Sequence, residues 1–85
     1  MEKNSEIRVG IFGLGGRGRG LLRNMVHIEG IQITALCDLY EERVERGKVI
    51  IEQAGRPAPL FTTADYRELI DCPDVDVVMI FAAWL

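Results

Sequence analysis

The sequence has few of the residues that build metal centres or disulfide frameworks, with two cysteines and one histidine among 85 residues. Cys37 and Cys72 lie far apart and have no further ligand at metal-binding spacing, so we expect two reduced, buried thiols typical of a cytoplasmic protein. His27 comes near the end of a predicted helix and is interpreted as a structural or solvated residue rather than an acid–base group. We therefore assign no metal ligand.

Long apolar runs and a strong charge of one sign are also missing. No apolar stretch reaches the roughly 18 residues of a membrane span, and residues 1–6 form a polar tail without the apolar core of a signal peptide. A formal net charge of -3 excludes bulk attraction to nucleic acid. The Arg17-Gly18-Arg19-Gly20 segment could be taken as a disordered nucleic-acid-binding tract, but it lies between an apolar strand and an amphipathic helix. We expect no nucleic-acid or membrane partner.

Hydrophobic residues make up 48% of the chain, which is enough for the core of one small domain. Their periodicity predicts alternating strands and helices. We expect strands at 7–12, 31–37, 60–61 and 76–83, the last covered on both faces because it is almost continuously apolar. Helices are predicted from about 16 to a stop at Gly30, from about 41 to 54, and from a Thr62–Asp65 capping box to about 70.

This order of elements predicts the α/β class. Right-handed crossovers place the first strand in the middle of the sheet, with the second and third on one side and the fourth on the other. We therefore expect a Rossmann-like, three-layer fold. Its parallel sheet has about four strands in the order 3-2-1-4, and helices cover both faces.

The turn after the first predicted strand matches the G-x-G-x-x-G pattern of dinucleotide-binding proteins. It follows a strand, it opens a helix, and an acidic residue ends the next strand at the expected spacing. Gly13 would allow the tight turn, Gly15 would let a pyrophosphate approach the backbone, and Gly18 would let the helix pack closely. A turn used only for packing is the alternative. The predicted cofactor-binding residues here are Gly13, Leu14, Gly15, Gly16, Arg17, Gly18 and Asp38.

Asp38 is expected to accept hydrogen bonds from the adenosine ribose hydroxyls. A carboxylate there repels the additional phosphate of NADP, and the next two residues carry no cation to receive it. We therefore predict NAD as the cofactor in preference to NADP, with Arg43 the one nearby cation that could change this. We also expect Arg17 or Arg19 to contact a phosphate.

A recognisable pattern is present in four segments, residues 9–18, 35–38, 66–69 and 74–78. These segments resemble the N-terminal domain of the Gfo/Idh/MocA oxidoreductases, and the resemblance extends along nearly the whole chain from Ile7. It implies binding of NAD or NADP and hydride transfer to or from sugars, inositols or related polyols. The Gly-Arg-Gly-Arg-Gly turn also resembles a branch that contains NAD-dependent glycosidases.

The same resemblance places Ala82, Ala83 and Trp84 on the nicotinamide side of the cofactor. Trp84 fits the family's usual Thr-Pro-Trp, whereas the two alanines depart from it. The family's catalytic Glu-Lys-Pro segment and histidine have no counterpart here, so no catalytic residue is assigned.

We accordingly expect residues 7–85 to be a truncated dinucleotide-binding domain whose substrate domain is absent. An oxidoreductase cofactor domain is the first interpretation. A glycosidase cofactor domain and a non-catalytic nucleotide-binding fragment are the alternatives. The apolar segment 77–85 would leave an open sheet edge, which predicts self-association.

Overall fold

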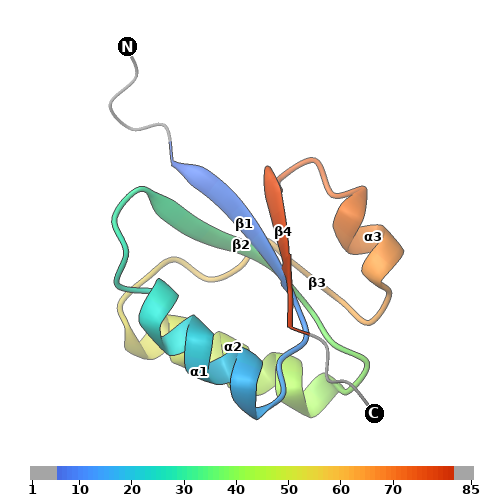
Figure 1. Cartoon of the computed structure of the whole chain (residues 1–85), viewed down its shortest axis with the longest axis horizontal. Helices are drawn as coiled ribbons and strands as arrows, with labels where there is room; N and C mark the ends of the chain where they lie inside the picture. Colours follow the sequence, from blue (N-terminus) through green and yellow to red (C-terminus); the bar gives the residue numbers. More distant parts are fainter. Residues whose placement is uncertain (1–5, 82–85) are drawn as a thin grey trace.

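The computed structural model describes residues 6–81 of the chain. Strands and helices alternate along these residues (Figure 1). Three parallel pairings join the four strands into one sheet with the order β3-β2-β1-β4. This confirms the predicted strand order and the Rossmann-like class. The elements are β1 (Ile7–Phe12), α1 (Gly16–Met25), β2 (Ile31–Cys37), α2 (Glu41–Gln53), β3 (Phe61–Thr63), α3 (Tyr66–Ile70) and β4 (Val77–Ile80).

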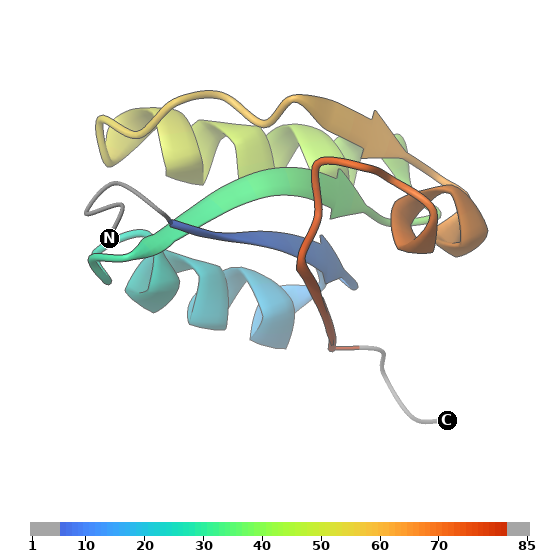
Figure 2. The same cartoon turned by 90° about the horizontal axis from the view of Figure 1, so that it is seen from above.

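Helices cover both faces of the sheet, and each face has its own apolar cluster. Alternate residues of β1 point in opposite directions: Val9 and Ile11 pack against α1 and α2, whereas Phe12 faces the side of α3. Figure 1 shows α1 and α2 together on one side of the sheet and α3 on the other. Figure 2 gives the view from above, in which β1 and β2 cross the middle of the molecule. On their shared face of the sheet, α1 and α2 run along opposite flanks of this pair of strands. The larger apolar cluster therefore lies between the strands β1 and β2 and the helices α1 and α2.

A one-residue bulge interrupts β2. Val9 pairs with Ile33 but Gly10 pairs with Ala35, so Thr34 is an additional residue in β2. Thr34 is buried, and its hydroxyl donates to the carbonyl oxygen of Asp74 at 2.6 Å. The bulge therefore anchors the loop before β4 to the middle of the sheet, a feature that the periodicity of the sequence did not predict.

The predicted end of the first helix was wrong. α1 ends at Met25, and the amides of His27 and Ile28 bond to carbonyl oxygens three residues earlier, which tightens the chain into turns. Ile28 is 46% exposed and does not continue the buried stripe. Gly30, with a φ of 88°, begins the turn into β2 instead of ending the helix.

The capping box before α3 was also wrong. Asp65 alone caps the helix, because its carboxylate accepts from the backbone amide of Arg67 at 2.9 Å. Thr62 is exposed within β3. The hydroxyl of Thr63 accepts from the Asp65 amide at 3.0 Å and bonds to the carboxylate of Glu68. Asp65 therefore takes the N-cap position that the sequence pattern assigned to Thr62, and Thr63 supports it from the end of β3.

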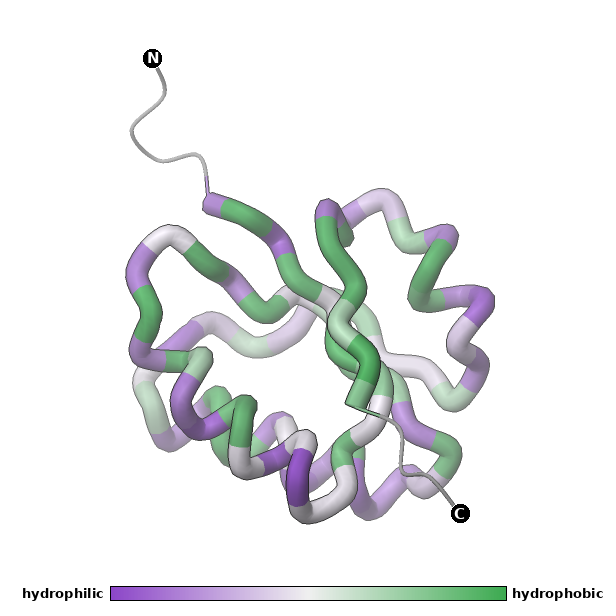
Figure 3. The backbone as a smooth tube through the Cα atoms, viewed as in Figure 1, coloured by the Kyte–Doolittle hydropathy of each residue, from purple (hydrophilic) through white to green (hydrophobic). Residues whose placement is uncertain are grey.

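The last strand is less covered than its apolar sequence predicted. Figure 3 shows that β4 is hydrophobic along its length, yet Val77 is 46% exposed and Ile80 is 61% exposed. Among residues 6–81, β4 pairs with β1 only, and its other edge is the outer edge of the sheet. Residues 82 and 83 of the predicted strand lie outside the described residues.

Candidate functional site at the glycine turn

The glycine turn joins β1 to α1 at the carboxyl edge of the sheet (Figure 1). Gly13 has a φ of 102°, a conformation that side chains disfavour, and its amide donates to the carbonyl oxygen of Cys37 at 2.9 Å. Gly15 is the residue that precedes the first turn of α1, and its carbonyl oxygen accepts from the Arg19 amide at 2.9 Å. The predicted strand–turn–helix arrangement is therefore present.

Gly18 makes the closest backbone approach in the turn. A β-carbon on Gly18 would lie 2.0 Å from the carbonyl oxygen of Gly13 and 3.5 Å from the β-carbon of Phe81. Because real side chains do not come so close to backbone atoms, only glycine fits here. Its absent side chain lets α1 begin directly against the ends of β1 and β4.

Gly15 has the opposite environment. Within residues 6–81, a β-carbon there would meet only the guanidinium of Arg43, at an ordinary contact distance of 3.6 Å. The φ of -68° suits any residue. The fold itself therefore does not require glycine at this position, and the missing side chain keeps the backbone of the turn accessible.

The first turn of α1 lacks a side-chain cap and a negative charge. Gly15 offers no side-chain cap, and no acidic residue lies in the first turn of the helix. The first backbone N–H groups of a helix lack intrahelical partners and form the positive end of its dipole. A phosphate would satisfy both features.

Asp38 follows β2 and is 5% exposed. One carboxylate oxygen, Oδ2, accepts from the Leu14 amide at 2.7 Å, and Oδ1 accepts from the Tyr40 amide at 2.9 Å. Two backbone donors thus compensate the burial of the charge. The acidic residue and the turn, which are 24 positions apart in the sequence, form one unit.

Three arginines surround this unit. Arg19 donates to the carbonyl oxygen of Leu14 at 2.8 Å, whereas Arg17 is exposed. The Nη1 atom of Arg43 lies 4.0 Å from Oδ2 of Asp38, and its guanidinium lies 4.8 Å from the centre of the Tyr40 ring. The sequence had named Arg43 only as a nearby cation, because its position across the turn depends on how α2 packs beside α1.

Cys37 lies next to Asp38 but is not a reactive group of the site. Burial, followed by the neighbouring Asp38 carboxylate, raises the pKa of the Cys37 thiol to about 11. The thiol is therefore protonated at neutral pH, as expected for a buried structural cysteine.

The remaining predicted site residues, Ala82, Ala83 and Trp84, lie outside the described residues. Phe81, the last described residue, donates its amide to the carbonyl oxygen of Phe12 at 2.7 Å at the carboxyl edge of the sheet. No group of three potential metal ligands is present within residues 6–81. None of the helices in this part of the chain could cross a membrane.

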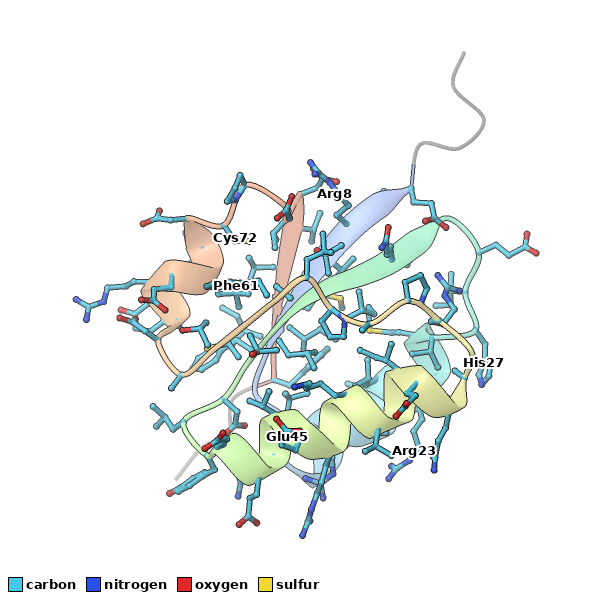
Figure 4. All side chains as sticks on the ribbon, turned by 180° about the vertical axis from the view of Figure 1, so that it is seen from behind. Arg8, Arg23, His27, Glu45, Phe61 and Cys72 are labelled. Carbon is cyan, nitrogen blue, oxygen red and sulfur yellow. The ribbon has the colours of Figure 1, made fainter. Side chains whose placement is uncertain are left out.

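A shallow hollow of about 220 Å³ lies elsewhere, at the C-terminal ends of α1 and α2. Figure 4 shows two of its residues, Arg23 and His27, near each other at this end of the helices. Because the glycine turn lies at the N-terminus of α1, the hollow is not part of the candidate site. Its lining residues are Arg23, Val26, His27, Ile50, Gln53 and Ala54.

The sheet order and the glycine turn define the chain as a Rossmann-type α/β domain. No model of a known protein family matches it. Over 85 aligned residues it is 44% identical to glycosyl hydrolase family 109 protein 1 of Bacteroides thetaiotaomicron, covering 96% of this chain and 18% of that protein. Over 87 residues it is 37% identical to a glycosyl hydrolase family 109 protein of Solibacter usitatus, covering 96% of this chain and 20% of that protein.

Solved structures agree with these relatives. Myo-inositol 2-dehydrogenase from Lactobacillus plantarum matches with a TM-score of 0.75 and 29% identity, over 92% of this chain and 22% of that chain. Scyllo-inositol dehydrogenase from Lactobacillus casei, with bound NAD(H) and scyllo-inositol, shares the fold with a TM-score of 0.76 at 22% identity, over 92% of this chain and 22% of that chain. The resemblance drawn from the sequence is confirmed: the chain is similar to the N-terminal Rossmann domains of the Gfo/Idh/MocA type. It spans about a fifth of the length of the curated relatives named above.

Proposed function

We propose that this chain is the NAD-binding part of an oxidoreductase that acts on sugars, inositols or related polyols. The observation that carries the proposal is the environment of Gly15, whose open backbone adjoins the uncapped N-terminus of α1 and the buried carboxylate of Asp38. When bound, the nicotinamide group would supply hydride transfer.

The residues of the turn have separate tasks in this proposal. The amides at the start of α1, from Gly16 to Gly18, hold the pyrophosphate against the positive end of the helix. Gly13 and Leu14 shape the turn, because their amides are bonded to Cys37 and Asp38. Asp38 uses its remaining lone pairs to accept from the ribose hydroxyls. Arg17 is the better candidate for a phosphate contact, because Arg19 is already bonded to the Leu14 carbonyl oxygen. Ala82, Ala83 and Trp84 are proposed on the nicotinamide side by the family resemblance alone.

NAD is proposed in preference to NADP. Asp38 is buried and held by two amides, so it cannot turn away from an approaching 2′-phosphate. Calorimetric titration of the chain with NAD and NADP tests this. Tighter binding of NAD is expected, and equal affinities would contradict the proposed preference.

A glycosidase cofactor domain is the second candidate. It is favoured by the names of the relatives, since the match at 44% identity is to a glycosyl hydrolase, whereas the inositol dehydrogenase match is 29% identical. The test needs the longer protein that contains this domain. Sugar cleavage without accumulation of NADH supports the glycosidase, whereas stoichiometric NADH production supports the oxidoreductase.

We further propose that the 85-residue chain works in the cytoplasm and associates with a second copy through β4. The buried free thiols of Cys37 and Cys72 suit a reducing compartment. The outer edge of β4 carries the exposed Val77 and Ile80, and such edges pair readily with another strand. Light scattering at high concentration should show dimers or larger species, and a monodisperse monomer would contradict the association.

A further inference from the structure

Arg19 lies where a helix least favours a cation, in the first turn of α1, which begins at Gly16. Its side chain reaches back to the glycine turn, where Nη1 donates to the carbonyl oxygen of Leu14 at 2.8 Å in a half-buried contact. The place of this cation is therefore explained by its bond to the turn and not by the stability of the helix.

Leu14, which receives this bond, is held at three points. Its side chain is fully buried in the larger apolar cluster, and its amide donates to Oδ2 of Asp38 at 2.7 Å. These two contacts fix the side chain and the peptide group before Leu14. Among the described residues, the bond from Arg19 is the only hydrogen bond to the next peptide group, which joins Leu14 to Gly15.

That peptide group has little else to prevent it from turning over. Its orientation depends on the ψ angle of Leu14 and the φ angle of Gly15, and glycine accepts values of φ that other residues avoid. In a planar trans peptide, the C=O and N–H groups point in opposite directions. By holding the oxygen of Leu14, Arg19 therefore also fixes the direction of the Gly15 N–H.

We propose that Arg19 is a positioning residue, which keeps the Gly15 N–H directed at the pyrophosphate of the cofactor. This inference rests on the proposed cofactor binding. Within residues 6–81 the Gly15 N–H has no acceptor, and it directly precedes the free amides at the start of α1. In the reversed orientation the Leu14 oxygen would face the phosphates and repel them. Arg19 thus acts through the backbone, without the phosphate contact expected from the sequence.

Three variants separate this role from a general effect of charge. Arg19→Met removes the donor but keeps an unbranched side chain, and Arg19→Lys retains a donor. Arg23→Met is the matched control, because Arg23 is exposed on the same helix and lines the hollow at its other end. In calorimetric titration with NAD, Arg19→Met should bind about five- to tenfold more weakly than wild type, the value of one hydrogen bond. Arg19→Lys should recover most of the affinity, and Arg23→Met should bind as wild type does.

Salt distinguishes positioning from a direct phosphate contact. The bond from Arg19 to Leu14 lies within the protein, so the ratio of the Arg19→Met and wild-type dissociation constants should stay constant between about 0.05 M and about 0.5 M NaCl. A direct contact between an exposed guanidinium and a phosphate would be screened. A ratio that falls toward one at high salt would overturn the inference.

Nuclear magnetic resonance of the free chain observes the peptide group itself. The amide signal of Gly15 should be single in the wild type and broadened or doubled in Arg19→Met, whereas that of Gly20, also in α1, should be unaltered. A single sharp Gly15 signal in Arg19→Met, or unchanged NAD affinity, would overturn the inference and leave the proposed function intact. A wild-type chain that bound no NAD would contradict the proposed function itself, and this inference with it.

Discussion

The Oδ2 atom of Asp38 accepts a hydrogen bond from the Leu14 amide at 2.7 Å, which ties the end of β2 to the glycine turn after β1. The carboxylate that is proposed to bind the ribose thus also shapes the turn that is proposed to bind the pyrophosphate. A change at Asp38 should affect both stability and cofactor choice.

Asp38→Asn should lower stability and weaken the preference for NAD. The amide group of asparagine has only one acceptor oxygen, so either Leu14 or Tyr40 loses the acceptor for its backbone N–H. Such a loss costs about 1–3 kcal/mol in a buried site. Removing the negative charge should also ease NADP binding.

Chemical denaturation measures the loss of stability, and titration with NAD and NADP measures the change in cofactor preference. Asp71→Asn, on the exposed end of α3, is the control. Unaltered stability would show that the two hydrogen bonds contribute little.

Gly18→Ala should destabilise the fold. The new methyl group would lie 2.0 Å from the Gly13 carbonyl oxygen, which forces α1 away from the end of β1. Overpacking of this kind typically costs about 1–3 kcal/mol. Gly20→Ala is the matched control, since its β-carbon would meet nothing within 4 Å in the part of the chain that the structure describes, and alanine favours the helix. We expect the melting temperature to fall for the first variant and to rise slightly for the second; equal melting temperatures would contradict the close approach.

Arg8 and Asp76 should make stability depend on acid pH. Figure 4 shows Arg8 beside the start of β4. Its side chain donates to both carboxylate oxygens of Asp76, at 3.1 Å and 2.9 Å. These hydrogen bonds from the Arg8 side chain, together with one from the Arg8 backbone amide, lower the pKa of Asp76 to about 2. The depressed pKa means that the pair stabilises the fold above the ordinary carboxylate pKa of about 4 and loses that effect as pH falls toward about 2.

Thermal unfolding of the wild type and of Asp76→Asn between pH 2 and 7 tests this linkage. The wild type should be the more stable protein at neutral pH, and the two curves should converge at the acid end. Asp71→Asn, at the exposed C-cap of α3, should retain the wild-type slope. Parallel curves for wild type and Asp76→Asn would refute the contribution of the pair.

Cys37 should be almost inert toward alkylation in the native chain. It is fully buried, and its pKa is raised to about 11 by that burial, so very little thiolate exists at pH 8. The Cys72→Ala variant leaves Cys37 as the only thiol. Reaction with iodoacetamide at pH 8 should be at least about a hundredfold slower in buffer than in denaturant. Comparable rates would mean that β2 opens readily at its carboxyl end.

Local patterns predicted the parts of the fold that depend on neighbours in sequence. The spacing of Gly13, Gly15 and Gly18 between an apolar strand and an amphipathic helix was sufficient for the turn, and Asp38 followed at the end of the next strand. Right-handed crossovers then led to the observed strand order. Each of these inferences uses a rule that acts within a single βαβ unit.

Features that depend on packing between units were not predictable in the same way. The additional residue Thr34 in β2 reflects a hydrogen bond to Asp74, 40 positions away. The exposure of Val77 and Ile80 depends on which elements adjoin β4, and an apolar run does not specify its neighbours. The position of Arg43 over Gly15 likewise depends on how α2 packs beside α1.

Gly15→Ala provides the most direct test of the central claim, which is that the turn exists to bind a dinucleotide. Among the described residues, the added methyl group would contact only Arg43, at 3.6 Å, so the variant should lose no more stability than the small difference between glycine and alanine at a helix N-cap. It would nevertheless occupy the space through which a pyrophosphate approaches the backbone. We predict that calorimetric titration shows NAD binding to the wild type and at least about tenfold weaker binding to Gly15→Ala. NAD binding of equal strength to both proteins, or to neither, would contradict the account.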